Sequence, residues 1–214
     1  MYAIVKDNNI TQYITNPKSV VIGDVRYPAK IFELWSKSEK EAIGIYEVVI
    51  DQTNYKDPEY YVNTNEQHNF ADGKVTKSWG TATPKLLEDR DEVWSQEQID
   101  NGNAPDGTSA GDPQLDSDGN QIVTKGLKSQ KKQIIKNQAS GLLAPTDWYV
   151  VKATEVTDYS VPANITTFRS NVRAKSNEME TQIDACTTVD ELKNLYTRDE
   201  NGIRPLAEFP KEVV

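Results

Sequence analysis

The segment 99–126 limits what this chain can fold into more than any other feature. It holds five of the eleven glycines and two of the ten prolines, and it offers almost no apolar side chain for burial. A segment of this kind cannot offset the entropy that is lost when it becomes ordered. We therefore expect a flexible acidic linker over 99–126, between an N-terminal module, 1–98, and a C-terminal module, 127–214.

The charge of the chain is concentrated in the same place. The chain has 33 acidic against 24 basic side chains, which gives a formal net charge of −9. The linker contains five Asp and one Lys and therefore carries a net charge of −4. Only 36% of the residues are hydrophobic, which is little for one compact globule of 214 residues. Two small modules are the expected result.

Composition also excludes several classes of protein. An acidic chain is a poor partner for nucleic acid, and no apolar run reaches the roughly 20 residues that span a bilayer. The start, Met1–Lys6, lacks the basic and long apolar stretches of a secretory signal. A single cysteine, Cys186, and a single histidine, His68, leave few routes to a disulfide, a metal site or a catalytic triad. We expect no enzyme, no cofactor and synthesis in the cytoplasm.

Local patterns predict an α+β N-terminal module with antiparallel hairpins. Short β-branched runs flank turn residues, and serine–glutamate spacing indicates a helix start. The predicted elements are hairpin strands at 2–6 and 10–14, a strand at 19–22, a helical turn at 31–35, a helix opened by Ser38 and Glu41, a buried strand at 45–50, a loop or edge strand around Tyr60-Tyr61, a hairpin turned by Asp72-Gly73, and a helix at 85–98.

The C-terminal module is predicted to be mainly helical. A helix at 127–142 places Leu127, Ile134, Ile135, Gln138, Ala139 and Leu142 on one face and Lys128, Lys131, Lys132 and Lys136 in solvent. The segment 147–153 suits a short strand or an extended segment. The longest helix begins after Pro162, and a capping box of Thr188 and Glu191 opens the last. Apolar side chains form a stripe on the longest helix: Ile165, Phe168, Val172, Met179, Ile183 and Cys186.

Two patterns invite a ligand-binding interpretation that the residues do not favour. Around Asp112–Gly119 the acidic spacing is like that of a calcium loop, but alignment on Gly119 puts Lys125 where the bidentate glutamate belongs. We expect an acidic turn there and no metal. The four lysines of 128–136 could hold phosphate, but the solvated face of an amphipathic helix is the better interpretation.

The aromatic residues leave two interpretations open. Ten tyrosines and four tryptophans are more than small cores need, with pairs at Tyr60-Tyr61 and Trp148-Tyr149. Exposed Tyr and Trp side chains are typical of protein or glycan interfaces. Alternatively, they fill two cores that are short of Leu and Ile.

Two stretches of the chain resemble a known family. The first contains Phe32–Ser36, the segment Ala42-Ile43-Gly44-Ile45-Tyr46, Asp57–Tyr61 and Phe70–Gly73. The second contains Gly141–Tyr149 with Thr146-Asp147-Trp148, then Ser160–Pro162, Phe168–Arg173 and Arg204–Pro210. Together they cover about two thirds of the chain and resemble small tail-region proteins of tailed bacteriophages, particularly of marine bacteria. In that family an α+β module with an AxGxY-type segment precedes a helical module that opens with TDW.

The resemblance implies one of two non-enzymatic roles. The first is a virion protein, an adaptor or accessory component of the tail fibre or baseplate, made in the host cytoplasm and carried in the tail. The second is a tail-fibre assembly chaperone. The expected partners are other phage tail or fibre proteins, with a homo-oligomer as an alternative. The expected interface residues are Ile165, Phe168, Val172, Met179 and Ile183 on the helical stripe, with Trp148, Tyr149, Tyr60 and Tyr61 as aromatic contacts.

Overall fold

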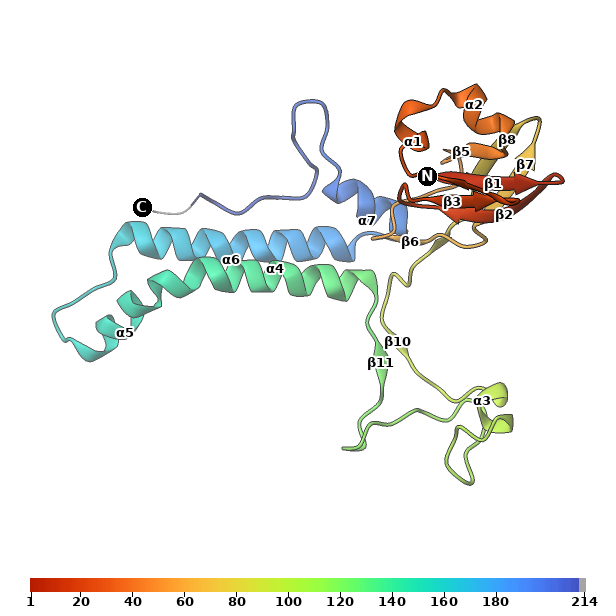
Figure 1. Cartoon of the computed structure of the whole chain (residues 1–214). Helices are drawn as coiled ribbons and strands as arrows, with labels where there is room; N and C mark the ends of the chain where they lie inside the picture. The colour runs from red at the N-terminus through yellow and green to blue at the C-terminus, as the bar shows by residue number, and fades with distance from the viewer. Residues whose placement is uncertain (212–214) are drawn as a thin grey trace. The chain divides into compact units, whose positions relative to one another are not determined.

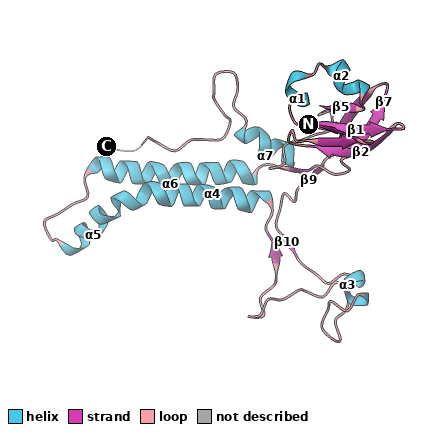
Figure 2. Cartoon of the chain, in the orientation of Figure 1, coloured by secondary structure: helices cyan, strands magenta, loops and turns pink. Residues whose placement is uncertain are grey.

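The protein is an α+β protein, as predicted. The computed structural model describes residues 1–211, and its backbone contacts divide the chain into two compact units, Met1–Thr83 and the remainder from Pro84. The first unit is rich in strands and the second is mainly helical (Figures 1 and 2). The division lies 15 residues before the expected module boundary at 98, because residues 86–89 form hydrogen bonds with residues 126–128, at the start of the first long helix of the second unit.

The first unit is built on a five-stranded sheet. Its order is β2-β1-β5-β8-β7, antiparallel except for the parallel pair β5 and β8. The predicted strand at 45–50 is its central strand. The strands are β1 (Tyr2–Lys6), β2 (Asn9–Ile14), β5 (Ile45–Ile50), β7 (Gln67–Ala71) and β8 (Lys74–Ser78).

Both predicted hairpins are present, and their turns have a common cause. Asp7 and Asn8 have φ of 50° and 62°, and Asp72 and Gly73 have φ of 51° and 68°. Two consecutive positive φ values characterise the type I′ turn, whose twist matches that of the flanking strands. Asn, Asp and Gly tolerate this region best, so local chemistry sets the register of both hairpins.

Apolar side chains cover both faces of the sheet. Ile4 and Ile45 point to one face, where β3 (Val20–Ile22), β4 (Val25–Tyr27) and α1 (Ile31–Leu34) pack; Ala3, Val48 and Val75 form a smaller cluster on the other. The predicted strand at 19–22 therefore lies outside the main sheet, in its own hairpin with β4. A further two-stranded ladder joins β6 (Tyr61–Val62) and β9 (Thr83–Pro84).

Gly44 explains why the AxGxY-type segment needs glycine. Its φ is +83°, and a Cβ there would lie 2.6 Å from the Val5 carbonyl oxygen. The Val5 amide also donates to the Gly44 carbonyl at 2.8 Å. Gly44 thus connects the end of α2 (Lys37–Ala42) to β5 through a contact that no larger residue permits.

Two predictions about helices in this half of the chain were wrong. The capping box is Ser36 with Glu39, two residues earlier than predicted, because the Glu39 carboxylate accepts from the Ser36 amide at 2.7 Å. Of the helix expected at 85–98 only α3 (Gln96–Asp100) forms. The preceding residues are extended, since the Leu86 and Leu87 carbonyls accept from the amides of Leu127 and Lys128.

The second unit centres on two long helices that lie side by side, α4 (Leu127–Leu143) and α6 (Ala163–Asp184) (Figure 1). Both were predicted, as was α7 (Val189–Tyr196), whose capping box of Thr188 and Glu191 forms. All members of the apolar stripe are buried, the last of them, Cys186, just beyond the end of α6. The stripe therefore packs within the unit.

The buried face of α4 differs from the prediction. Lys128 and Lys131 are buried, whereas Ile134 is exposed. Lys128 donates to the Glu88 carboxylate and to the Asp184 carbonyl, and the Lys131 Nζ lies 4.5 Å from the centre of the Tyr196 ring. A lysine stem can be buried when its ammonium group is paired, so the apolar pattern alone placed this face incorrectly.

The segment 147–153 is also corrected, from strand to helix. The turn η1 (Ala144–Thr146) has Pro145 in its first turn and runs directly into α5 (Asp147–Glu155). Proline is well tolerated at a helix start, because the amide that it lacks would have no partner there. None of the helices within 1–211 is long and apolar enough to cross a membrane.

The stripe on α6 generates a stability prediction. Val172→Asp or Met179→Asp buries a carboxylate without a partner and is expected to lower the free energy of unfolding of the second unit by about 3 kcal/mol or more. Ala174→Asp is the matched control, because Ala174 is exposed on the same helix. Urea unfolding followed by circular dichroism measures the effect, and equal midpoints for Val172→Asp and Ala174→Asp would contradict the packing described.

Candidate interaction surfaces

The structure separates the nine predicted interface residues into core and surface. Seven are buried: the five from the α6 stripe, together with Tyr60 and Tyr61. Trp148 is 51% exposed and Tyr149 is half-buried. A partner could reach the seven buried side chains only if the segments that cover them moved away, so Trp148 and Tyr149 are the predicted residues that a partner can contact directly.

Tyr60 and Tyr61 are both among the buried side chains of the protein. Burial, followed by the nearby Glu59 and Asp57 carboxylates, raises the pKa of Tyr60 to about 12. The Lys56 Nζ lies 4.3 Å from the centre of the Tyr61 ring. For this pair the structure has the core-filling arrangement, one of the two interpretations that the sequence left open.

Helix α5 carries an apolar surface that the second unit does not cover. None of its nine side chains is buried. The Trp148 and Tyr149 rings lie 3.8 Å apart, centre to centre, and Val151 is 52% exposed. We call Trp148, Tyr149, Val150 and Val151 the α5 patch. Trp148 and Val151 are three residues apart and share one face of the helix, and an exposed apolar face is typical of a contact surface.

A buried arginine holds the start of α5 in place. The Arg169 guanidinium donates to the Leu143 carbonyl at 3.0 Å and to the Thr146 hydroxyl at 2.6 Å, and pairs with the Asp147 carboxylate at 2.8 Å. Thr146 and Asp147 are the first two residues of the TDW segment. They are therefore anchors, while the third residue, Trp148, is left at the surface.

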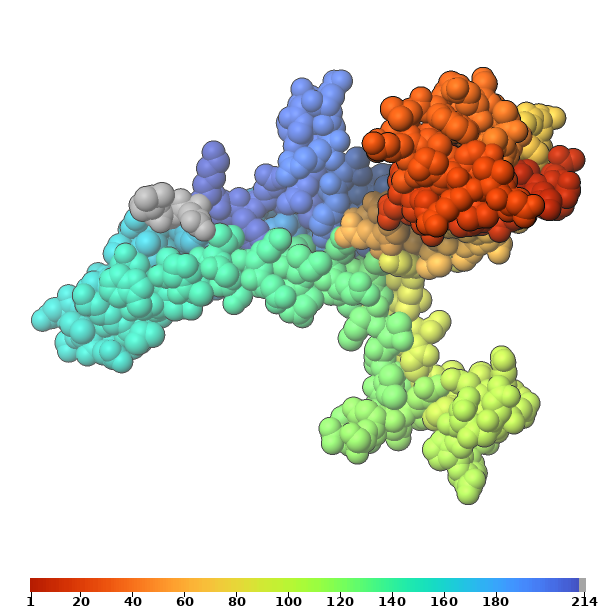
Figure 3. All heavy atoms as spheres, viewed as in Figure 1, coloured from red at the N-terminus to blue at the C-terminus, as the bar shows by residue number. Residues whose placement is uncertain are grey.

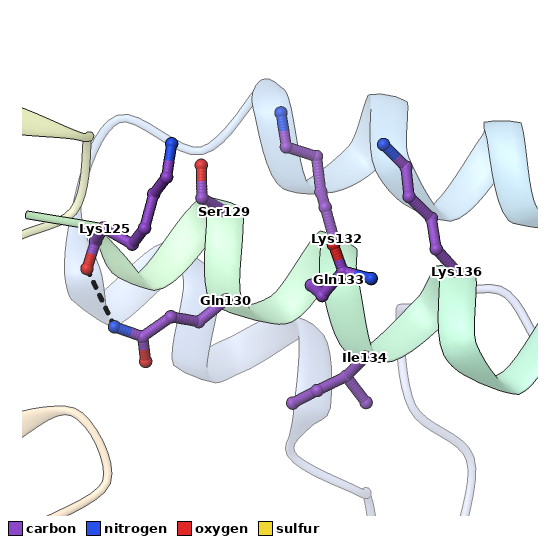
Figure 4. Close-up of a pocket in the computed structure, with 7 residues that line it drawn as sticks. All are labelled: Lys125, Ser129, Gln130, Lys132, Gln133, Ile134 and Lys136. Atoms are coloured by element: carbon purple, nitrogen blue, oxygen red, sulfur yellow. Dashed lines mark hydrogen bonds between the residues drawn. The ribbon is translucent and has the colours of Figure 1, made fainter. Parts of the chain in front are cut away.

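A groove of about 580 Å³ runs along α4, lined mainly by polar side chains (Figure 4). Its lysines all have acidic partners: Lys125 with Asp89 at 2.8 Å, Lys132 with Asp184 at 2.7 Å and Lys136 with Glu180 at 3.4 Å. A phosphate would have to compete with these carboxylates. The groove therefore gives no support to a phosphate site, although the alternative expected from the sequence, a solvated face, holds for only part of the lysine run, because Lys128 and Lys131 are buried.

Residues 89–125 form an arm with its own hydrogen bonds. The strands β10 (Arg90–Asp91) and β11 (Val123–Thr124) pair, and the Glu92 carbonyl accepts from the Gln114 amide at 2.9 Å. Figure 3 shows the atoms of the arm, yellow to green, standing apart from those of the long helices. The segment expected to be a linker thus contains regular contacts throughout, which composition did not indicate.

The base of the arm is tightly closed. The Gly126 amide donates to the Asp89 carboxylate at 2.9 Å. Hydrogen bonds from Lys125, Ser129 and this same amide lower the pKa of that carboxyl to about 2. A Cβ on Gly126 would lie 2.3 Å from the Glu88 carbonyl oxygen, so only glycine permits this approach of the two strands.

The arm is the most acidic part of the molecule. It contains nine acidic residues against Arg90 and Lys125, which gives it −7 of the chain's −9. Both cations are already paired, Arg90 with Glu92 at 2.9 Å and Lys125 with Asp89. Several apolar side chains are nevertheless exposed on the arm: Val93, Leu115 and Ile122.

The remaining candidates for chemistry, Cys186, His68 and Asp116, have packing or turn-forming roles. Cys186 is buried, and burial, followed by Glu191, raises the pKa of its thiol. His68 packs its ring 4.5 Å from that of Tyr13. The Asp116 carboxylate closes a turn by accepting from the amides of Asp118 and Asn120. Over residues 1–211 no three His, Cys, Asp or Glu side chains gather as metal ligands would.

Sequence reasoning missed the roles of Arg169, Asp89 and Gly126. Arg169 follows a stripe residue directly, and an arginine next to an apolar position is usually solvent-exposed. Asp89 and Gly126 are 37 residues apart, and no local pattern connects them. A glycine at the junction of a polar segment and a helix was the one available signal.

Comparison with known proteins adds no relative: no family model, curated protein or solved structure matches this chain.

Gly126 generates a prediction with an internal control. Gly126→Ala is expected to separate residues 87–89 from the start of α4 and to destabilise the second unit. Gly141→Ala is expected to stabilise it by about 1 kcal/mol, because alanine is the better helix former and a Cβ there meets open space. Thermal unfolding of both variants tests the pair, and a gain in stability from Gly126→Ala would contradict the closed base.

Arg169 generates a second prediction. Arg169→Met leaves the Thr146 hydroxyl without this donor and is expected to cost about 1–3 kcal/mol while speeding hydrogen exchange of the α5 amides. Arg173→Met is the control, since Arg173 is exposed and makes no hydrogen bond or ion pair with the residues described. Unchanged exchange in α5 of Arg169→Met would show that the guanidinium does not hold this helix.

Proposed function

We propose that this chain is a non-enzymatic bacteriophage virion protein, an adaptor or accessory component of the tail fibre or baseplate that acts through protein–protein contacts. The observation that carries the proposal is the α5 patch. It begins at the tryptophan of the TDW segment, one of the stretches through which the sequence resembles tail-region proteins.

The geometry of the patch supports a contact role. Arg169 contacts Thr146 and Asp147, and these contacts fix the backbone from which the next residue, Trp148, projects. A large aromatic side chain on a positioned helix loses little conformational entropy on binding and buries a large area. Trp148 is accordingly the proposed centre of the contact, with Val151 beside it.

The predicted use of the α6 stripe is not part of this proposal. The stripe forms the core between the two long helices, and its residues stabilise the unit that presents α5. Partner contact is assigned to the surface around Trp148 and Tyr149. The partners proposed are other tail or fibre proteins, in the host cytoplasm during assembly and in the tail of the mature particle.

A tail-fibre assembly chaperone is the second candidate. The acidic arm favours it, because a strongly charged segment with exposed aliphatic side chains can cover a folding partner while keeping the complex soluble. The two candidates differ in whether the chain remains in the finished particle.

A charge-insertion experiment tests the adaptor role. Trp148→Asp combined with Val151→Asp is expected to leave the fold intact, because both side chains are exposed, and to reduce incorporation into purified phage particles at least ten-fold. Val25→Asp combined with Ile203→Asp adds the same charge at two other exposed apolar positions and is expected to have no effect. Mass spectrometry of the particles measures incorporation.

The outcomes separate the candidates. Presence of the unmodified chain in particles, and its loss only with the α5 variant, supports the adaptor. Absence of the unmodified chain from particles, together with misfolded fibre in cells that lack it, refutes the adaptor in favour of the chaperone. Equal loss with the control pair would remove the α5 patch from the proposal.

A further inference from the structure

Trp94, on the arm, lies in a groove that no side chain of the protein fills. The groove has a volume of about 380 Å³ and apolar walls formed by Trp94, Pro105, Pro113 and Leu115. Leu115 is 53% exposed. The space is large enough for one extended side chain and part of its backbone.

The groove is held open by backbone contacts on both sides. The Trp94 amide donates to the Asp112 carbonyl at 2.9 Å, and the Gly111 amide donates to the Trp94 carbonyl at the same distance. Elsewhere along the groove the Thr108 amide donates to the Pro105 carbonyl at 3.2 Å and closes a turn. The site is therefore formed before any ligand binds.

Two carboxylates lie at the groove, and neither is neutralised. Asp106 and Asp112 both line it, and neither forms an ion pair within the described chain. The Asp112 carboxylate is oriented by the Ser109 amide, which donates to it at 2.8 Å. The only two cations of the arm, Arg90 and Lys125, are paired with other carboxylates.

The indole of Trp94 differs from the other three in the chain. Trp35, Trp79 and Trp148 each contact another aromatic ring, and the last two also have a lysine over the ring face. Within residues 1–211, Trp94 has neither kind of contact. An indole face beside two unpaired carboxylates is a suitable environment for a cation.

We propose that this groove binds an arginine side chain from an extended segment of a partner protein. The planar guanidinium stacks on the Trp94 indole while its N–H groups donate to Asp106 and Asp112. The net charge of −7 on the arm attracts a basic segment over longer range. The site is separate from the α5 patch and does not depend on the proposed function.

The experiment uses the full chain labelled with ¹⁵N at its tryptophan indoles. Trp94→Phe assigns the Trp94 signal among the four. The probe is a Gly-Arg-Gly-Arg-Gly peptide at low salt, and the comparison peptides carry lysine or the neutral isostere citrulline in place of arginine. We expect the Trp94 signal to shift with the arginine peptide and the dissociation constant to rise about ten-fold with citrulline.

Paired variants test the carboxylates. Asp106→Asn with Asp112→Asn is expected to weaken binding of the arginine peptide about ten-fold. Asp100→Asn with Asp118→Asn makes the same change in net charge elsewhere on the arm. Both pairs are measured at 0.15 M salt, where the screening length is about 8 Å, and the control pair is expected to weaken binding less than two-fold. The other three indole signals report that the rest of the chain is folded, and an unchanged Trp94 signal before peptide is added reports that the arm keeps its structure.

Four results would overturn the proposal. Equal binding of the citrulline peptide would show that the groove does not require a cation. Tighter binding of the lysine peptide would show that it does not select a guanidinium group. Equal weakening by both variant pairs would reduce the effect to the general charge of the arm. A Trp94 signal that shifts with protein concentration, without peptide, would assign the groove to a second copy of this chain.

Discussion

The buried guanidinium of Arg169 connects the interior of the second unit to its surface. It has three partners from the chain around the start of α5, and burial makes each contact costly to lose. Because Thr146 and Asp147 are held, α5 begins at a fixed position, and Trp148 follows them at an exposed position. The presentation of the α5 patch thus depends on a polar contact beneath it.

Charges are distributed in opposite ways in the two parts of this unit. In the helical pair, Lys128, Lys132 and Lys136 all have acidic or carbonyl partners within the chain. On the arm, both cations are paired and most carboxylates are not. Intramolecular pairing stabilises the helices, whereas the unpaired charge of the arm is available to a partner.

The predicted interface residues illustrate what the sequence could not distinguish, which is burial inside the protein from contact with a partner. The stripe from Ile165 to Ile183 was recognised as an apolar face, but an apolar face looks the same whether a partner or the chain's own α4 covers it. The same ambiguity applied to the tyrosine and tryptophan pairs. Tyr60 and Tyr61 are buried while Trp148 is exposed, and residue type does not distinguish them.

Local chemistry determined much of this protein from the sequence alone. The hairpins turned at Asp7-Asn8 and Asp72-Gly73 require only residues that tolerate positive φ, and the long helices require only apolar spacing with a defined start. Tertiary structure decided the rest, because its determining contacts join residues far apart in the chain. Asp89 meets Gly126, Glu88 meets Lys128 and Arg169 meets Thr146. These contacts order the arm, bury a lysine face and expose α5, and no periodicity in the sequence encodes them.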